Sequence, residues 1–166
     1  AGVNRPERDE DFEEVNTGLT RAIISLLERE GRKPGIVFSS STQVLLDNPY
    51  GMSKKKAEAL LQDYARRTGA SVYIYRFPNV FGKWSRPNYN SVVATFCYNI
   101  ARGLDITISD EKKELELVYV GDVVDNFLEV LKDGSKCETP TYLSVAPTYK
   151  VTLGDLARKV YQLRDI

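Results

Sequence analysis

The chain reads G-I-V-F-S-S-S-T-Q at residues 35–43, N-P-Y-G-M-S-K at residues 48–54 and V-Y-I-Y-R-F-P-N-V-F-G at residues 72–82. The first and third segments contain short apolar runs rich in β-branched and aromatic residues, which is typical of strands in a buried parallel sheet. The middle segment opens a helical pattern, and its proline stands where a helix can begin without losing a hydrogen bond. The order strand, loop, helix, strand predicts one right-handed βαβ unit.

Polar residues follow the strands of this unit. Ser41 stands at the end of the first strand, and Asn79 follows the second. Tyr50 and Lys54 are four residues apart at the start of the helix, so their side chains lie on one face. In parallel α/β sheets, ligands bind outside the carboxyl ends of the strands. The sequence therefore predicts a site around these four residues.

The residue types Ser, Tyr and Lys suit the interconversion of a ketone and an alcohol. A tyrosine that donates a proton near neutral pH needs a pKa below its usual value of about 10. A nearby ammonium group lowers it by favouring the phenolate, and Lys54 is placed to do this for Tyr50. The Ser41 hydroxyl can hold the substrate oxygen against the tyrosine. The reaction would also need a hydride donor on the opposite side.

A Tyr-x-x-x-Lys pair is a weak signal when taken alone. The composition of this chain predicts roughly 0.7 such pairs by chance. The same residues also fit purely structural roles. The tyrosine and lysine could be solvated surface residues, the serines could cap a strand, and the asparagine could lie in a turn after Pro78. The catalytic interpretation depends on all three segments occurring in one order.

Composition excludes several other classes of protein. The chain has 166 residues, which suits one domain with a sizeable core, and its 23 basic and 23 acidic residues balance. We therefore expect no nucleic-acid partner, and no apolar run is long enough to predict a membrane span. The absence of histidine excludes a His base and His-based zinc sites, and we expect no metal. Cys97 and Cys137 predict reduced thiols in a cytoplasmic protein, with Cys97 in the core.

Hydrophobic periodicity predicts the remaining elements. We expect helices over residues 9–30, 91–102 and from 121, and a last helix capped by Thr152. Alternating residues 106–108 and 115–119 predict a hairpin or two edge strands, and 142–145 a short strand. The buried side of the helix from 121 is expected to consist of Val124, Phe127, Leu128 and Leu131. The pattern is α/β, without the glycine-rich first turn of a dinucleotide-binding domain.

At this point a family resemblance becomes clear. The segments V-F-S-S-S, Y-G-M-S-K and Y-R-F-P-N-V-F-G resemble the extended short-chain dehydrogenase/reductases, the NAD-dependent epimerase/dehydratase family of sugar-nucleotide enzymes. Ala1-Gly2 resembles the end of the family's H-L-A-G segment, Asn16 matches its E-x-N position, and residues 117–123 resemble its Y-V-x-D-V motif. The resemblance implies a partial Rossmann-like, doubly wound fold. Residues 1–82 would belong to the NAD(P)-binding domain, and residues 83–166 mainly to the substrate-binding portion.

The resemblance also implies roles for individual residues. Tyr50 would donate the proton, Lys54 would lower its pKa and bind the nicotinamide ribose, and Ser41 would bind the substrate oxygen. The residues expected to contact NADP or NAD are Ala1, Gly2, Ser39, Tyr50, Lys54, Phe77 and Pro78. Those expected to contact a UDP-sugar are Asn79, Lys83, Trp84, Arg86 and Asn88. A solvated surface loop would be equally basic, but a lone tryptophan in a polar loop often packs on something.

Within the family, D-N-P-Y-G at residues 47–51 and F-G-K-W-S-R-P-N-Y-N-S-V-V-A-T-F-C-Y at residues 81–98 are most similar to the reductase domains of bifunctional capsular-polysaccharide enzymes. Such domains reduce the 4-ketone of a UDP-4-keto-6-deoxy-N-acetylhexosamine with NADPH. Thr42-Gln43 stand where the family's dehydratases carry Asp-Glu, which argues against dehydration. The absence of histidine argues against reductases that also epimerise. A 4-epimerase and a non-catalytic sugar-nucleotide-binding module stay open.

The resemblance predicts that this chain is a piece of a longer protein. No initiator Met is present, and neither the first four strands with their glycine-rich turn nor a carboxyl-terminal cupin domain is found. We expect an open sheet edge as a result, and the activity of this piece alone stays open. The family further implies a homodimer formed through the helices at residues 9–30 and 54–67.

Overall fold

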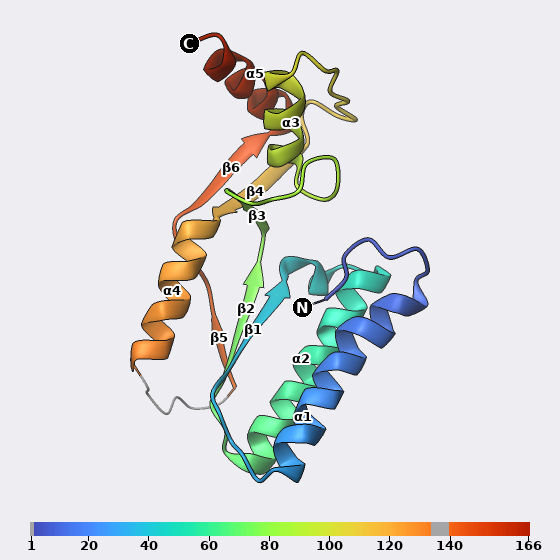
Figure 1. Ribbon diagram of the computed structural model, residues 1–166, viewed down its shortest axis with the longest axis vertical. Helices are drawn as coiled ribbons and strands as arrows, with labels where there is room; N and C mark the ends of the chain where they lie inside the picture. Colours follow the sequence, from blue (N-terminus) through green and yellow to red (C-terminus); the bar gives the residue numbers. More distant parts are fainter. Residues whose placement is uncertain (1, 134–139) are drawn as a thin grey trace. The chain divides into compact units, whose positions relative to one another are not determined.

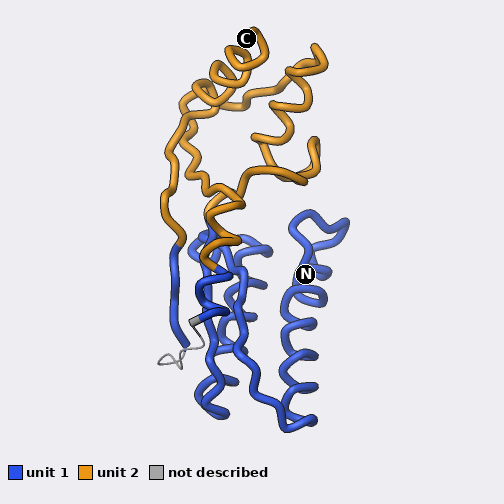
Figure 2. Tube along the Cα trace, turned by 60° about the vertical axis from the view of Figure 1, so that its left-hand side comes forward, with its two compact units in different colours: residues 1–77, 127–144 blue, residues 78–126, 145–166 orange. Residues whose placement is uncertain are grey.

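The computed structural model describes residues 2–133 and 140–166, which form two units (Figures 1 and 2). Residues 1–77 and 127–144 make up the first unit, and residues 78–126 and 145–166 make up the second. The chain therefore passes between the units three times, at residues 77/78, 126/127 and 144/145. Ala1 and Cys137, which carry expectations from the sequence, lie outside the described residues.

A three-stranded parallel sheet forms the centre of the first unit. Its strands are β1 (Ile36–Ser41), β2 (Val72–Phe77) and β5 (Thr141–Leu143), in the order β1-β2-β5. The predicted βαβ unit is confirmed, with Ile36 level with Val72 and Ser41 level with Phe77. Among the described residues, β1 pairs on one side only and is an edge strand of this sheet.

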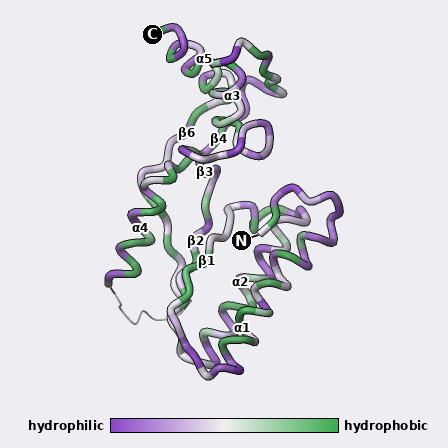
Figure 3. The backbone as a smooth tube through the Cα atoms, in the orientation of Figure 1, coloured by the Kyte–Doolittle hydropathy of each residue, from purple (hydrophilic) through white to green (hydrophobic). Residues whose placement is uncertain are grey.

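Two helices lie side by side on one face of this sheet (Figure 1). They are α1 (Leu19–Arg29), preceded by the π-helical turn Phe12–Gly18, and α2 (Pro49–Thr68). Figure 3 shows hydrophobic and hydrophilic residues alternating along both helices, as expected for helices with one buried face. The core between helices and sheet consists of Ile24, Leu61, Tyr64, Ala65, Ala70, Val72 and Ile74.

The ends of α2 follow local rules that the sequence already shows. Pro49 occupies the first turn, where a missing N–H costs no hydrogen bond, and the Asn48 side chain accepts a bond from the Gly51 N–H at 2.8 Å. Gly69 ends the helix with φ of 71°, a left-handed conformation that glycine adopts without strain. The 3-10 turn Thr42–Leu45 joins β1 to this helix.

The opposite face of β2 meets helix α4 (Val120–Asp133). Tyr75 stacks on Phe77 with ring centroids 5.4 Å apart, and Phe127 lies 5.1 Å from Tyr75. Phe127 thus faces inward as predicted, but Val124, Leu128 and Leu131 are exposed, so that part of the prediction is wrong. The described residues therefore cover only part of the apolar stripe on α4.

The second unit is built on a mixed sheet of three strands. β4 (Glu114–Tyr119) runs parallel to β3 (Asn79–Phe81) and antiparallel to β6 (Thr148–Thr152). Helices α3 (Val92–Ala101) and α5 (Leu153–Arg164) pack together beside it. Their core consists of Phe96, Ile100, Leu153, Leu156, Ala157 and Val160.

Two sequence expectations for this unit are wrong. No hairpin forms across residues 106–119, because β4 pairs with β3 and β6, while Ile106 and Ile108 pack against the core from a non-strand segment. Cys97 is exposed and not part of the core. On α3, Phe96 and Ile100 are one turn apart and take the buried face, which turns the neighbouring Cys97 outward.

Candidate active site

The serine run at the end of β1 contacts the start of α2. The Lys54 ammonium donates a hydrogen bond to the Ser39 carbonyl at 3.0 Å, and the Tyr50 hydroxyl lies close enough to the Ser41 side chain for its pKa to be affected. Ser41 also accepts a bond from the Gln43 N–H at 3.2 Å, which helps to hold its hydroxyl at the strand end. The structure thus brings together the three residues expected to be catalytic.

A close contact between α2 and the preceding turn fixes the position of Tyr50. A Cβ on Gly51 would lie 2.1 Å from the Gln43 carbonyl oxygen and 3.2 Å from that of Leu46. Only a glycine allows the first turn of the helix to approach the backbone of residues 42–46 so closely. Tyr50, next to this glycine, is therefore held against the end of β1.

Tyr50 is half-buried in an environment that keeps its hydroxyl protonated. Burial raises the pKa of this hydroxyl above its ordinary value of 10.0, and the nearby Ser41 side chain acts in the opposite direction. The edge of the Phe12 ring packs on the Tyr50 ring, with centroids 5.8 Å apart. The structure differs here from the expectation that Lys54 lowers the pKa of Tyr50. The ammonium lies 5.9 Å from the ring centroid and is bonded to Ser39.

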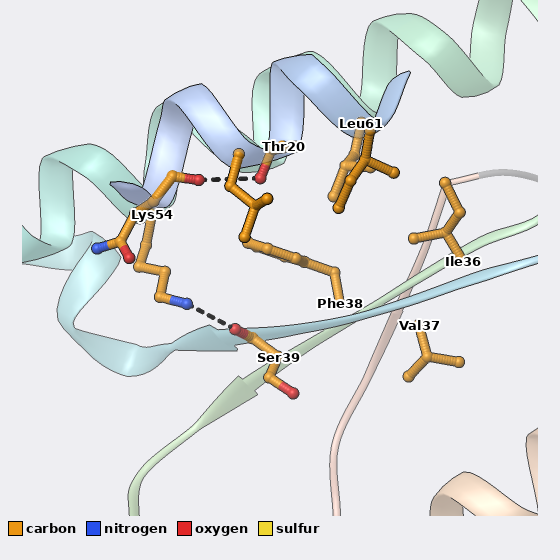
Figure 4. Close-up of a pocket in the computed structure, with 10 residues that line it drawn as sticks. Thr20, Ile36, Val37, Phe38, Ser39, Lys54 and Leu61 are labelled. Atoms are coloured by element: carbon orange, nitrogen blue, oxygen red, sulfur yellow. Dashed lines mark hydrogen bonds between the residues drawn. The ribbon is translucent and has the colours of Figure 1, made fainter. Parts of the chain in front are cut away.

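Lys54 is buried, and its burial lowers the pKa of the ammonium. Its Nζ also lies over the ring of Phe38, 5.1 Å from the centroid. Figure 4 shows the side chain reaching from α2 to Ser39 at the wall of a cavity of about 240 Å³. An ammonium group has three N–H donors, and one is given to Ser39, so donors remain for the two hydroxyls of a nicotinamide ribose.

Asn16 ties the amino-terminal segment to α2. It is buried, and its side chain accepts from the Val3 N–H at 2.9 Å while donating to the Val3 carbonyl and to the Ser53 hydroxyl, both at 3.0 Å. A Cβ on Gly2 would lie 2.7 Å from Asn16 Oδ1 and 3.8 Å from Lys54 Nζ. Gly2, expected to contact the cofactor, therefore lies beside Lys54. Asn16 sits in the π-helical turn, a feature that often marks functional sites.

The other residues expected to bind ligands are divided between the two units. Phe77 belongs to the first unit, where it is buried and stands level with Ser41 in the sheet. Pro78 and Asn79 belong to the second unit, and Asn79 donates to the Glu116 carbonyl at 3.2 Å. The cofactor role of Phe77 and Pro78 and the substrate role of Asn79 stay predictions.

The basic loop at residues 83–90 also belongs to the second unit. Trp84 is 99% exposed, so it does not pack within this chain, and it has φ of 70°. Asn88 is held by bonds from its N–H to Thr95 Oγ1 at 2.9 Å and from its side chain to Asn99 Oδ1 at 3.1 Å. Lys83 and Arg86 are exposed as well, so the loop presents two cations and an indole to solvent.

A buried carboxylate that the sequence reasoning missed lies one helical turn beyond Lys54. Glu58 is 2% exposed and accepts hydrogen bonds from Ser40 Oγ at 2.5 Å, from Arg76 at 2.7 and 3.0 Å, and from the Tyr142 hydroxyl at 3.0 Å. Burial alone would raise the pKa of Glu58, but the bonds from Arg76, Ser40 and Tyr142 outweigh it and leave the pKa below its ordinary 4.5. A charged residue on a helical stripe otherwise rich in alanine and leucine was the available signal.

We expect Glu58 to make the stability of the protein depend on acid pH. Because its pKa is lower in the folded protein than in the unfolded chain, the stabilisation is complete above about pH 4.5 and is lost as the pH falls through the lowered pKa. The urea midpoint, measured from neutral pH to about pH 3, should fall less steeply in Glu58→Gln than in the wild type. Equal slopes would show that the carboxylate does not carry this pH dependence.

Neither a metal-binding cluster nor a membrane-spanning helix is present in the part of the chain that the structure describes. No group of three or more Cys, Asp or Glu side chains there is arranged to hold a metal ion. None of its helices combines the length and the hydrophobicity needed to cross a membrane.

Comparison with known proteins identifies relatives over the whole chain. It is 47% identical over 165 residues to a UDP-2-acetamido-2,6-beta-L-arabino-hexul-4-ose reductase of Pseudomonas aeruginosa, covering 99% of this chain and 44% of that protein. A crystal structure of the capsular polysaccharide assembling protein CapF from Staphylococcus aureus matches with a TM-score of 0.80 and 44% identity, over 88% of this chain and 40% of that one. The chain thus spans less than half the length of these relatives.

A more distant structure has the same fold. The NADPH complex of RMD from Pseudomonas aeruginosa matches with a TM-score of 0.81 at 20% identity, over all of this chain and 65% of that one. The model of the NAD dependent epimerase/dehydratase family matches residues 2–146. This match includes the serine run, Tyr50 and Lys54. The chain therefore belongs to the NAD dependent epimerase/dehydratase family.

Proposed function

We propose that the protein containing this chain is an NAD(P)-dependent nucleotide-sugar reductase. Its substrate would be a UDP-4-keto-6-deoxy-N-acetylhexosamine, used in the synthesis of a bacterial capsule or O-antigen sugar. The observation that carries the proposal is that the Tyr50 hydroxyl lies close enough to Ser41 for its pKa to be affected, with the buried Lys54 ammonium one helical turn away. The 47% identity to a reductase of a UDP-hexulose supports the same reaction and substrate class.

The geometry of these residues suits proton donation to a ketone. NADPH or NADH supplies the hydride when bound. Tyr50, kept protonated by its raised pKa, gives its phenolic proton to the substrate oxygen, so that the C=O group becomes CH–OH. Ser41 holds that oxygen in place through its hydroxyl. The Lys54 ammonium, with N–H donors left over after its bond to Ser39, would hold the ribose hydroxyls of that cofactor beside Tyr50.

The loop of the second unit is proposed to bind the UDP-sugar. Its exposed Lys83 and Arg86 can neutralise a pyrophosphate, and the exposed indole of Trp84 offers a flat apolar surface for a sugar or base. Asn79 and the anchored Asn88 supply amide groups for hydroxyl or acetamido groups.

The proposal is tested with the full-length protein, NADPH or NADH, and the UDP-hexul-4-ose. Oxidation of one reduced cofactor for each sugar nucleotide that gains two hydrogens, measured by absorbance and mass spectrometry, would support reduction. Conversion of a UDP-sugar to its 4-epimer, with no change in mass and no net oxidation of cofactor, would overturn reduction in favour of epimerisation. Binding of the sugar nucleotide without either conversion would overturn both in favour of a binding module.

Two further expectations stay predictions. A homodimer formed through the first two helices is consistent with the apolar stripe on α1, where Leu19, Ile23 and Leu26 are 37%, 45% and 47% exposed. A cytoplasmic location follows from the family resemblance.

A further inference from the structure

Three consecutive serines contact three residues that follow one another at four-residue intervals on α2. The Ser41 side chain lies beside the Tyr50 hydroxyl, and the Ser39 carbonyl accepts a hydrogen bond from Lys54. Ser40, between them, donates to Glu58 at 2.5 Å. Residues at positions i, i+4 and i+8 lie in a row on one helix face, so the three serines at the end of β1 all contact the same face of α2. Only the third contact lies outside the proposed chemistry.

Glu58 links α2 to all three strands of its sheet. Its carboxylate accepts from Ser40 on β1, from two nitrogens of Arg76 on β2, and from the hydroxyl of Tyr142 on β5. The Arg76 guanidinium in turn lies over the Tyr142 ring, 4.6 Å from its centroid. Four directed bonds therefore meet on one buried side chain, one helical turn from Lys54 and two from Tyr50.

We propose that Glu58 is a positioning residue, which holds α2 in the register where Tyr50 meets Ser41 and Lys54 meets Ser39. This inference rests on the proposed function of those residues. Glu58 itself would touch neither the substrate nor the cofactor.

Stability alone does not explain the network. Leu61, Tyr64 and Ala65 already fasten α2 to the sheet by apolar packing, and a buried ion pair is often no more stabilising than hydrophobic residues of the same size. Apolar packing, however, tolerates small slides. A shift of one residue along a helix moves it by about 1.5 Å and turns it by about 100°, which would separate both catalytic contacts. Directed bonds to fixed strands oppose that movement.

The test compares Glu58→Gln and Ser40→Ala with Asp63→Asn in the full-length protein. Asp63 is the matched control, because it is an exposed carboxylate on the same helix, paired with Arg67 at 2.7 Å. We expect Glu58→Gln to lower kcat by about tenfold to a hundredfold, with KM for the UDP-hexul-4-ose nearly unchanged, because a misplaced catalytic group costs rate. Ser40→Ala, which leaves the pair with Arg76 intact, should lower kcat less, and Asp63→Asn should not lower it.

The pH profile separates positioning from simple loss of stability. If Tyr50 moves away from Ser41 in Glu58→Gln, the influence that lowers the pKa of Tyr50 weakens, this pKa rises, and the alkaline limb of kcat moves to higher pH. A lower melting temperature with unchanged kcat and pH profile would overturn the inference and leave Glu58 a structural residue. If Glu58→Gln does not fold, an unchanged kcat and profile in Ser40→Ala overturns it. Tyr50→Phe separates the two proposals, because its full activity would overturn the proposed function itself.

Discussion

Replacing Tyr50 by Phe should lower kcat for ketone reduction by about 10²–10⁴-fold, the usual contribution of a general acid. The substitution removes one oxygen and keeps the ring that packs on Phe12. Lys54 and its bond to Ser39 are untouched, so the Kd for NADPH should stay close to that of the wild type. Stopped-flow measurement of cofactor oxidation gives the rate, and fluorescence titration gives the Kd.

Tyr64→Phe is the matched control for this substitution. This substitution also removes a phenolic hydroxyl from α2, but at a position 14 residues beyond Tyr50. The Tyr64 hydroxyl donates to the Arg32 carbonyl at 3.3 Å and has no part in the proposed chemistry. A small loss of stability, on the order of 1 kcal/mol, is expected with kcat unchanged. If Tyr50→Phe were as active as Tyr64→Phe, Tyr50 would not be the proton donor and the reductase mechanism would be wrong.

Gly51→Ala should destabilise the protein by about 1–3 kcal/mol, because it forces an extra atom into a filled space. The new Cβ would lie 2.1 Å from the Gln43 carbonyl oxygen and 2.9 Å from the carbonyl carbon. Both are backbone atoms, so the clash cannot be relieved by a side-chain rotation. Either α2 or the turn Thr42–Leu45 must move, and kcat should fall as well because Tyr50 moves away from Ser41.

Gly18→Ala is the control for the glycine substitution. Gly18 has helical φ and ψ of −62° and −44°, and a Cβ there would meet only the Glu13 carbonyl at an ordinary 3.8 Å. Alanine should stabilise this position by roughly 0.5–1 kcal/mol. Urea denaturation of both variants measures the difference. An unchanged urea midpoint for Gly51→Ala would contradict the prediction, because the backbone would then accommodate the Cβ without loss of stability.

Local signals in the sequence account for most of the secondary structure. The apolar run before the serines, Pro49, Gly69 and Thr152 predicted a strand, a helix start, a helix end and a cap, and each is confirmed. These features depend on hydrogen bonds and dihedral angles within a few residues, so a single chain segment is enough to predict them. The strands β3 and β6 were missed because they are short and exist through pairing with β4.

Burial was predicted less well, since periodicity shows which residues share a face but not what covers it. Cys97 and Leu128 both lie on apolar helical patterns, and both are exposed. On helix α4, Phe127 packs against the rings of Tyr75 and Phe77 in the sheet, whereas Val124, Leu128 and Leu131 on the same apolar stripe are exposed.

The proximity of Ser41, Tyr50 and Lys54, the residues proposed to be catalytic, was predicted from their spacing and order, because a βαβ unit brings a strand end and the next helix start together by its topology. The environment of these groups depends on three-dimensional packing. Burial raises the pKa of Tyr50, against the expectation from the neighbouring lysine, and Glu58 finds partners 18 and 84 residues away in the chain. Short-range pattern specifies which residues meet, whereas desolvation and long-range hydrogen bonds arise only when separate strands assemble around them.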